Sequence, residues 1–181
     1  LSGVLTAVLW SIMFNQHFGV LNDLLAKLGI IKEPIAWLAN TKFVLGSVIV
    51  AELWRGIPFF AISLLAAMQG LPDDIYEAAR VDGSTKFQTF RFITLPMLKN
   101  TIVLTTLLRT IWEFNSVDLI YSLTGGGPVG KTTTLSMLIA NQAIKTSNYG
   151  YGSALSVVSF AILAVIAVIY MKLSGFGKEE A

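Results

Sequence analysis

Long runs of uncharged, apolar residues constrain the fold of this chain more than any other feature. Residues 157–170 read VVSFAILAVIAVIY, apolar except for one serine. They belong to a segment, 154–173, about as long as the roughly 20 residues that cross a bilayer as a helix. The segments 43–68 and 101–123 are similar. Membrane β-strands would alternate polar and apolar residues, and these runs do not, so we predict three membrane-spanning helices.

A fourth apolar segment opens the chain. Residues 1–14 are apolar from the start but too short to cross a bilayer, and the polar residues Asn15, Gln16 and His17 follow. We interpret this segment as the end of a truncated span, with further spans upstream. The sequence thus predicts an all-α, polytopic membrane helix bundle, in which residues 1–181 form part of a single transmembrane domain.

The composition supports a membrane setting and argues against several chemistries. Hydrophobic residues make up 54% of the chain and charged residues 13%, whereas about a quarter of residues are charged in an ordinary soluble domain. A net charge of +2 is too small to indicate a nucleic-acid partner. With no cysteine and one histidine, His17, the chain offers no zinc-thiolate site or cysteine nucleophile. We predict no catalytic residue, metal site or cofactor.

One motif points elsewhere. Residues 125–134, GGGPVGKTTT, fit the phosphate-loop pattern G-x-x-x-x-G-K-[ST] through Gly125, Gly130, Lys131 and Thr132. In nucleotide-binding proteins such a loop cradles phosphates with backbone N–H groups, and its hydroxyl holds Mg²⁺. A P-loop NTPase fragment is therefore a remote alternative. The apolar composition and the lack of a later apolar strand ending in an acidic residue oppose it, and we interpret the match as coincidence.

The segment between the second and third apolar runs is strongly charged. Residues 71–100 read LPDDIYEAARVDGSTKFQTFRFITLPMLKN. The pattern predicts a short helix over about 75–82, with Asp73 or Asp74 as its N-cap and Glu77 as a capping-box partner. Such a loop is too long and too polar to be a simple turn, so we expect something to dock on it.

The second half of this loop carries its own helix signals. Gly83 is placed to end the first helix, Ser84 to cap a second one, and Pro96 to begin the next segment. The sequence therefore predicts a compact helix-turn-helix between two spans. An amphipathic helix lying on the lipid surface is the alternative.

The loop also carries a long spaced motif. It contains EAA, three residues, G, nine residues and I-x-LP. With this motif the chain resembles the permease subunits of binding-protein-dependent ABC importers. Shorter matches, GVLNDLL at 19–25, WL at 37–38 and LTGGGP at 123–128, resemble the carbohydrate-type branch of that family. The resemblance implies the type I ABC importer permease fold, of which this chain is the C-terminal part.

In that family the loop is cytoplasmic and couples the spans to a separate ATPase subunit. The resemblance thus implies that residues 71–100 are the coupling loop, that this chain is not an enzyme, and that ATP hydrolysis resides on the partner. Small alanines suit a close approach, and a glycine permits a sharp turn. The residues assigned to ATPase coupling are Glu77, Ala78, Ala79, Asp82, Gly83, Ile93, Leu95 and Pro96.

The resemblance further implies a function and a set of partners. We expect a subunit that forms the translocation pathway for a sugar or oligosaccharide in the cell membrane of a bacterium or archaeon. Its expected partners are an ABC ATPase, a second permease, a soluble or lipid-anchored substrate-binding protein and membrane lipid. A permease for another solute, such as a glycerol phosphate, is an alternative. A channel or secondary transporter would not require the EAA motif.

Ionisable residues inside the predicted spans are candidates for the substrate path, because they are costly in lipid and usually face a protein interior or a cavity. Two pairs could instead neutralise each other along one helix face. One is Glu52 with Arg55, spaced i,i+3, and the other is Arg109 with Glu113, spaced i,i+4. Neighbouring aromatic and polar side chains suit a sugar, which stacks on rings and hydrogen-bonds through hydroxyls. The candidate path residues are Trp54, Arg55, Trp112, Glu113, Asn115, Asp118 and Tyr121.

Overall fold

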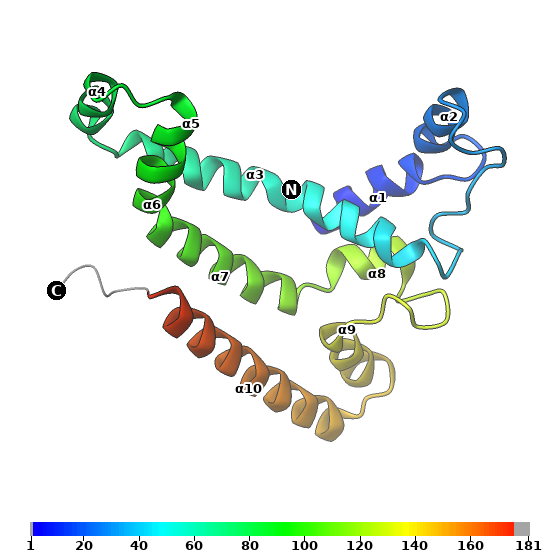
Figure 1. Cartoon of the computed structure of the whole chain (residues 1–181). Coiled ribbons are helices and arrows are strands. Elements are labelled where there is room, and N and C mark those ends of the chain that lie inside the picture. Colours follow the sequence, from blue (N-terminus) through cyan, green and yellow to red (C-terminus); the bar gives the residue numbers. More distant parts are fainter. Residues whose placement is uncertain (1, 176–181) are drawn as a thin grey trace. The chain divides into compact units, whose positions relative to one another are not determined.

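The computed structural model describes residues 2–175, and every regular element in that range is helical (Figure 1). The predicted all-α class is therefore confirmed. The elements in order are α1 (Gly3–Met13), α2 (Val20–Lys27), α3 (Val44–Gln69), α4 (Asp73–Val81), α5 (Lys86–Thr89), η1 (Phe90–Thr94), α6 (Leu95–Met97), α7 (Lys99–Asn115), α8 (Asp118–Thr124), α9 (Leu135–Ala140), η2 (Asn141–Lys145) and α10 (Tyr149–Ser174). The two η elements are π-helices.

Among the described residues, two helices are long and apolar enough to cross a membrane, α3 and α10. Their bounds agree with the apolar segments 43–68 and 154–173, although α10 begins earlier. Only 17% of the most apolar window of α3 and 6% of that of α10 is buried within the chain. The core helix of a soluble protein would be mostly buried, so these exposed faces suit contact with lipid or other helices.

The apolar segment 101–123 does not form one continuous helix. It is divided into α7 and α8, with the break at Ser116 and Val117. The Ser116 hydroxyl donates to Asp118 Oδ1 at 2.9 Å, and the Ser116 N–H donates to Glu113 O at 3.1 Å. Short polar side chains offer such local alternatives to helical hydrogen bonds, which explains why hydropathy alone missed the break.

The chain divides into two compact units. Unit 1 comprises Leu1–Gly56 and Trp112–Ile162, and unit 2 comprises Ile57–Ile111 and Leu163–Ala181. In unit 1, α1 packs on α8 (Figure 1). Small residues such as Ala7 and Ala51 let the backbones approach closely, as in many membrane bundles. The buried cluster of unit 1 is Ala7, Val48, Ala51, Leu119, Ile120, Leu123 and Met137.

A buried asparagine organises the loop that joins α2 to α3. The Asn22 side chain is 6% exposed and uses both of its polar atoms. Its Nδ2 donates to Gln16 O at 3.1 Å and to Ile35 O at 2.9 Å, while its Oδ1 accepts from Ile35 N at 3.2 Å and from Trp37 Nε1 at 2.9 Å. Asn22 thereby replaces backbone pairing for a segment without regular structure.

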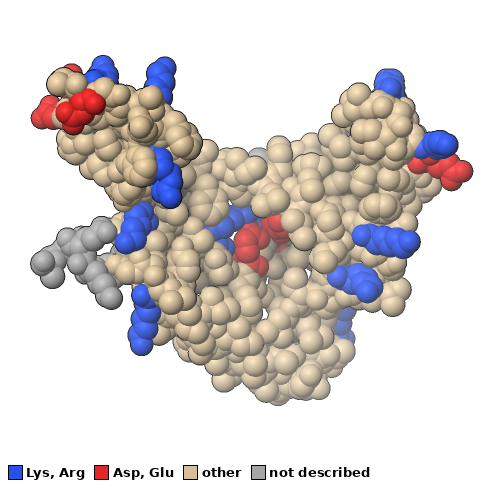
Figure 2. Space-filling model, viewed as in Figure 1, with Lys and Arg blue, Asp and Glu red and all other residues tan. Residues whose placement is uncertain are grey.

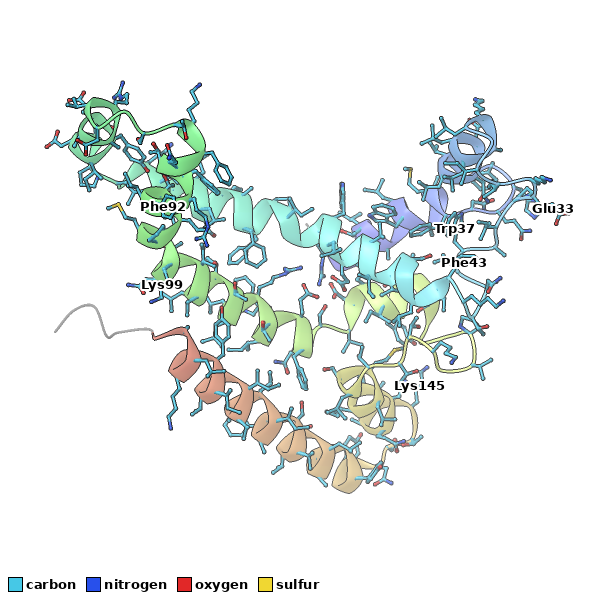
Figure 3. The ribbon with its side chains drawn as sticks, viewed as in Figure 1. Glu33, Trp37, Phe43, Phe92, Lys99 and Lys145 are labelled. Atoms are coloured by element: carbon cyan, nitrogen blue, oxygen red, sulfur yellow. The ribbon has the colours of Figure 1, made fainter. Side chains whose placement is uncertain are left out.

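The ring of Trp37 connects this loop to the residues that flank α1 and α3. Its centroid lies 5.6 Å from that of Phe43 and 6.0 Å from that of Phe14 (Figure 3). The ring thus links the C-terminal end of α1 to the N-terminal end of α3, while its Nε1–H donates to Asn22 Oδ1. These contacts supply a physical reason for the Asn22 and Trp37 positions of the short motifs GVLNDLL and WL.

We predict that Asn22→Ala lowers the free energy of unfolding by about 2–4 kcal/mol, because it leaves several buried partners without a hydrogen bond. Asn148→Ala is the matched control: Asn148 is exposed, and its Oδ1 accepts a hydrogen bond from Tyr151 N at 3.2 Å. The control should cost less than about 1 kcal/mol. Thermal unfolding of the detergent-solubilised protein measures both, and equal losses would contradict the structural role of Asn22.

Candidate functional site

The charged loop in unit 2 is built from two helices joined by a tight turn. Gly83 follows α4 with φ +74°, and its N–H donates to Arg80 O at 3.1 Å, while Ser84 N donates to Ala79 O at 3.0 Å. This pair of bonds is the Schellman motif, which needs a left-handed residue that glycine adopts without cost. The predicted stop at Gly83 is confirmed.

The start signals of both helices differ from the prediction. Pro72 occupies the N-cap of α4 with φ −63°, and no side chain caps that end. The capping box predicted for Asp73 or Asp74 with Glu77 is therefore wrong. The second helix does have a capping box, but Thr85 forms it with Gln88, through bonds of 3.3 Å and 2.8 Å. The predicted cap, Ser84, instead donates its hydroxyl to Ala79 O at 2.7 Å.

The residues assigned to coupling divide by exposure. Ala79 is buried at 6% exposed, and Ile93 and Leu95 are half-buried, so these three hold the loop together. The exposed members are Glu77, Ala78, Asp82, Gly83 and Pro96. On the face shown in Figure 2, charged side chains gather over α4 and α5. Phe92 of η1 (Figure 3) is apolar and 72% exposed.

A second polar assembly lies within unit 1 and centres on Arg55 of α3. Its Nη2 lies 2.9 Å from Glu52 Oε2 and 3.3 Å from Glu113 Oε1, and its Nη1 lies 3.3 Å from Asp118 Oδ1. Nη2 also donates to Ser116 Oγ at 3.0 Å. The Arg55 side chain is only 11% exposed. We call these residues, Glu52, Arg55, Glu113, Ser116 and Asp118, the Arg55 cluster.

The Arg55 cluster contains one of the two ion pairs expected along a helix face and adds partners from other helices. The i,i+3 pair of Glu52 with Arg55 is present. Glu113 and Asp118, predicted separately as path residues, meet the same guanidinium from positions around the α7–α8 break. The sequence missed Ser116, although a short hydroxyl two residues before an aspartate is a recognisable local signal. A guanidinium in an apolar chain needs such multiple acceptors, since a buried unpaired charge costs several kcal/mol.

The aromatic path candidates lie on three helices, α3, α7 and α8. Trp54 is 43% exposed and meets Trp10 edge-on, with ring centroids 6.3 Å apart. Tyr121 lies under Lys145 Nζ, which is 5.1 Å from its ring centroid and was not predicted as a site residue. Trp112 is 52% exposed on the last turn of α7, where Asn115 is also exposed. The structure thus joins Arg55, Glu113 and Asp118 directly.

Gly3 sets how closely α1 approaches the cluster. A Cβ at Gly3 would lie 2.0 Å from Asp118 Oδ2 and 2.3 Å from Asp118 Cγ. The contact involves a short side chain that is itself bonded to Arg55 and Ser116, so it cannot yield freely. Only glycine allows the α1 backbone to pass here, a requirement that the sequence alone did not reveal.

We predict that Gly3→Ala destabilises the protein by about 1–3 kcal/mol, because the new methyl group displaces Asp118 from the cluster. Gly46→Ala is the matched control, since Gly46 is also helical and a Cβ there meets nothing within 4 Å. The control should be neutral or stabilising by up to about 1 kcal/mol. Unfolding of the purified variants measures both, and equal stability would refute the close approach.

The phosphate-loop pattern is not built as a phosphate site. A helix, α8, precedes it instead of a strand, and several of its backbone donors are used within the loop. Gly127 N donates to Thr124 O at 3.0 Å, Lys131 N to Pro128 O at 3.1 Å, and Thr132 N to Gly126 O at 3.2 Å. The Thr132 hydroxyl, 4% exposed, donates to Gly127 O at 3.0 Å. Three backbone donors of the expected cradle and the hydroxyl expected to hold Mg²⁺ are therefore already hydrogen-bonded within the loop.

Comparison with known proteins identifies the family. Residues 2–175 match the family described as binding-protein-dependent transport system inner membrane component. This chain belongs to that family. The permease has relatives of the carbohydrate type, which confirms the resemblance drawn from the EAA motif. As a membrane component of a transport system it is not an enzyme, as predicted.

Two curated relatives illustrate the similarity. The chain is 37% identical over 176 residues to the trehalose/maltose transport system permease protein MalF of Thermococcus litoralis, covering 97% of this chain and 59% of that protein. It is also 37% identical to the lactose transport system permease protein LacF of Rhizobium radiobacter, covering 92% and 58%. The chain thus spans somewhat more than half the length of these relatives.

The fold has counterparts among solved structures. A chain of a bacterial alginate ABC transporter, in complex with an alginate pentasaccharide-bound periplasmic protein, superimposes with a TM-score of 0.84 at 24% identity, covering 96% of this chain and 60% of that one. A further structure of an importer of the acidic polysaccharide alginate has a TM-score of 0.80. These likenesses support the fold of an ABC importer permease, as predicted.

Proposed function

We propose that this chain forms part of the translocation pathway of an ABC importer for a sugar or oligosaccharide, with residues 71–100 as the loop that couples it to a separate ATPase. A second permease completes the pathway, and a soluble or lipid-anchored binding protein delivers the substrate. The proposed spans are those predicted from hydropathy, 1–14, 43–68, 101–123 and 154–173, with a break in the third at Ser116.

The observation that carries this proposal is the preformed loop of unit 2. The Schellman turn at Gly83 and the Thr85 capping box fix the path of the chain without help from any partner. At the same time Glu77, Ala78 and Asp82 remain exposed. A rigid element with an exposed small-residue and acidic face can enter a partner at one angle, which is what mechanical coupling requires.

The substrate proposal has separate support. The relatives named above are described as carriers of trehalose, maltose and lactose. In this chain the Arg55 cluster offers carboxylates and a guanidinium for hydroxyl groups, and the exposed rings of Trp54, Trp112 and Tyr121 offer stacking surfaces. A glycerol phosphate is the alternative solute, favoured if transport requires a phosphate.

We predict that Gly83→Val weakens ATPase association or lowers the transport obtained per ATP. Valine reaches φ +74° only at a cost of about 1–2 kcal/mol, so the second helix is misdirected. Gly29→Val is a matched control, because Gly29 has φ +71° with nothing within 4 Å of its Cβ and lies outside the loop. Glu77→Lys should act as Gly83→Val does.

The measurements are co-purification of the ATPase, its hydrolysis rate and sugar uptake in proteoliposomes. Normal assembly and normal uptake per ATP in both Gly83→Val and Glu77→Lys would refute the coupling role of residues 71–100. A loss shared by Gly29→Val would trace the defect to general instability instead, and would refute it as well.

For the substrate path, we predict that Trp112→Leu raises the KM for sugar uptake about two- to ten-fold, the range expected for losing one aromatic stacking contact. Phe18→Leu is the control, since Phe18 is 70% exposed and lies outside the proposed path. Sugar binding to the isolated binding protein should be unchanged. Uptake of a phosphorylated solute but of no sugar would favour the alternative.

A further inference from the structure

A hydrogen bond in unit 2 joins the first helix of the loop to the helix that leads into α7. The Tyr76 hydroxyl, on α4, lies 3.1 Å from the Thr94 hydroxyl, at the end of η1. Thr94 is only 4% exposed, and Tyr76 is half-buried. A shielded hydrogen bond between two side chains 18 positions apart fixes the distance between their helices more strictly than an apolar contact does.

The hydrogen bonds of Ser84 hold a different part of the loop, before η1 begins. Ser84 Oγ donates to Ala79 O at 2.7 Å and contacts Thr89 Oγ1 at 2.9 Å, which secures the turn at Gly83. Thr89 is the last residue of α5 and precedes η1. The Tyr76–Thr94 bond therefore reaches from α4 to the last residue of η1, directly before α6 begins at Leu95.

The segment that ends at Thr94, η1, is a π-helix, so the Tyr76–Thr94 bond holds one end of an irregular helical turn. In η1 the Leu95 N–H bonds to Phe90 O, a five-residue step, so one residue more than an α-helical turn is accommodated. Such segments are common at functional sites, because a shift to the α register rotates everything beyond them. Beyond Thr94 lie α6 and then α7, which begins at Lys99 (Figure 3).

We propose that Tyr76 and Thr94 are a positioning pair that transmits movement of α4 through η1 to α7, a role that rests on the proposed coupling function of the loop. Coupling between sites needs an element with two arrangements that both sites bias. In this proposal the π segment is that element, and the partly buried Tyr76–Thr94 hydrogen bond ties its register to the position of α4. Without the bond, α4 still docks, but its displacement no longer sets the register that α7 follows.

Three single variants test the pair in the assembled transporter with its ATPase and binding protein. Tyr76→Phe and Thr94→Val each remove one hydroxyl while keeping shape, and Thr94→Ser keeps the hydroxyl. We expect the first two to lower sugar imported per ATP by at least about two-fold while the ATPase still co-purifies, and Thr94→Ser to retain coupling. The double variant should be no worse than the poorer single one, because both remove the same bond.

Thr105→Val is the matched control. Thr105 is also buried, at 7% exposed, but its hydroxyl donates to Thr101 O of its own helix at 2.7 Å. This variant should change stability without changing import per ATP. A general structural defect would affect Thr105→Val and Thr94→Ser as well, and that result would overturn the proposal.

The remaining outcomes are also decisive. Normal import per ATP in Tyr76→Phe and Thr94→Val, with a defect in Gly83→Val, would overturn the positioning pair but leave the coupling loop standing. Normal import per ATP in all loop variants, including Gly83→Val, would overturn both the positioning pair and the coupling role of the loop. Additive losses in the double variant would show that the two hydroxyls act separately, which also overturns the proposal.

Discussion

The pairing of Arg55 with three carboxylates is the interaction on which unit 1 depends. A guanidinium that is 11% exposed within an apolar helix must be neutralised and hydrogen-bonded, since burying it alone would cost several kcal/mol. Glu52 forms an ion pair with it from the same helix, whereas Glu113 and Asp118 must be brought to it. The break at Ser116 is what allows the end of α7 and the start of α8 to present acceptors to one side chain. The need of the Arg55 guanidinium for hydrogen-bond acceptors thus accounts for the position of the break in the third apolar segment.

The packing of unit 1 follows from that arrangement. Asp118 can stand beside Arg55 only because Gly3 leaves room for its carboxylate. From there α8 continues as an apolar element whose Leu119 and Leu123 join Ala7 of α1 and Ala51 of α3 in the buried cluster. The loop of unit 2 is organised differently. Its turn and caps are local, so its shape does not depend on distant partners, which suits an element proposed to meet a separate subunit.

Much of this could be predicted from the sequence, because the relevant signals are local. Hydropathy placed α3 and α10, and one glycine placed the end of α4, since each depends on neighbouring residues alone. The predicted N-cap residues of the loop helices were wrong. Pro72, with its fixed φ, took the N-cap position that Asp73 or Asp74 was expected to fill, and Thr85 outcompeted Ser84 because Gln88 stands three residues after it. The long-range contacts were beyond prediction. Arg55 lies 58 positions from Glu113 and 63 from Asp118, and helical spacing offers no signal at such separations.

The segment GGGPVGKTTT shows why a short pattern must be tested against hydrogen bonding. A phosphate loop works because consecutive N–H groups point inward with no partner of their own and so solvate an anion. Here the same glycines and threonines form a self-contained turn, in which Gly126 O and Gly127 O accept from Thr132 and the Thr124 and Thr132 hydroxyls lie 2.7 Å apart. A phosphate entering this loop would have to break these bonds before gaining any of its own. The two kinds of loop share the same residues at the pattern positions, but in this one the N–H groups of Gly127, Lys131 and Thr132 already donate to carbonyl oxygens of the loop and of the end of α8.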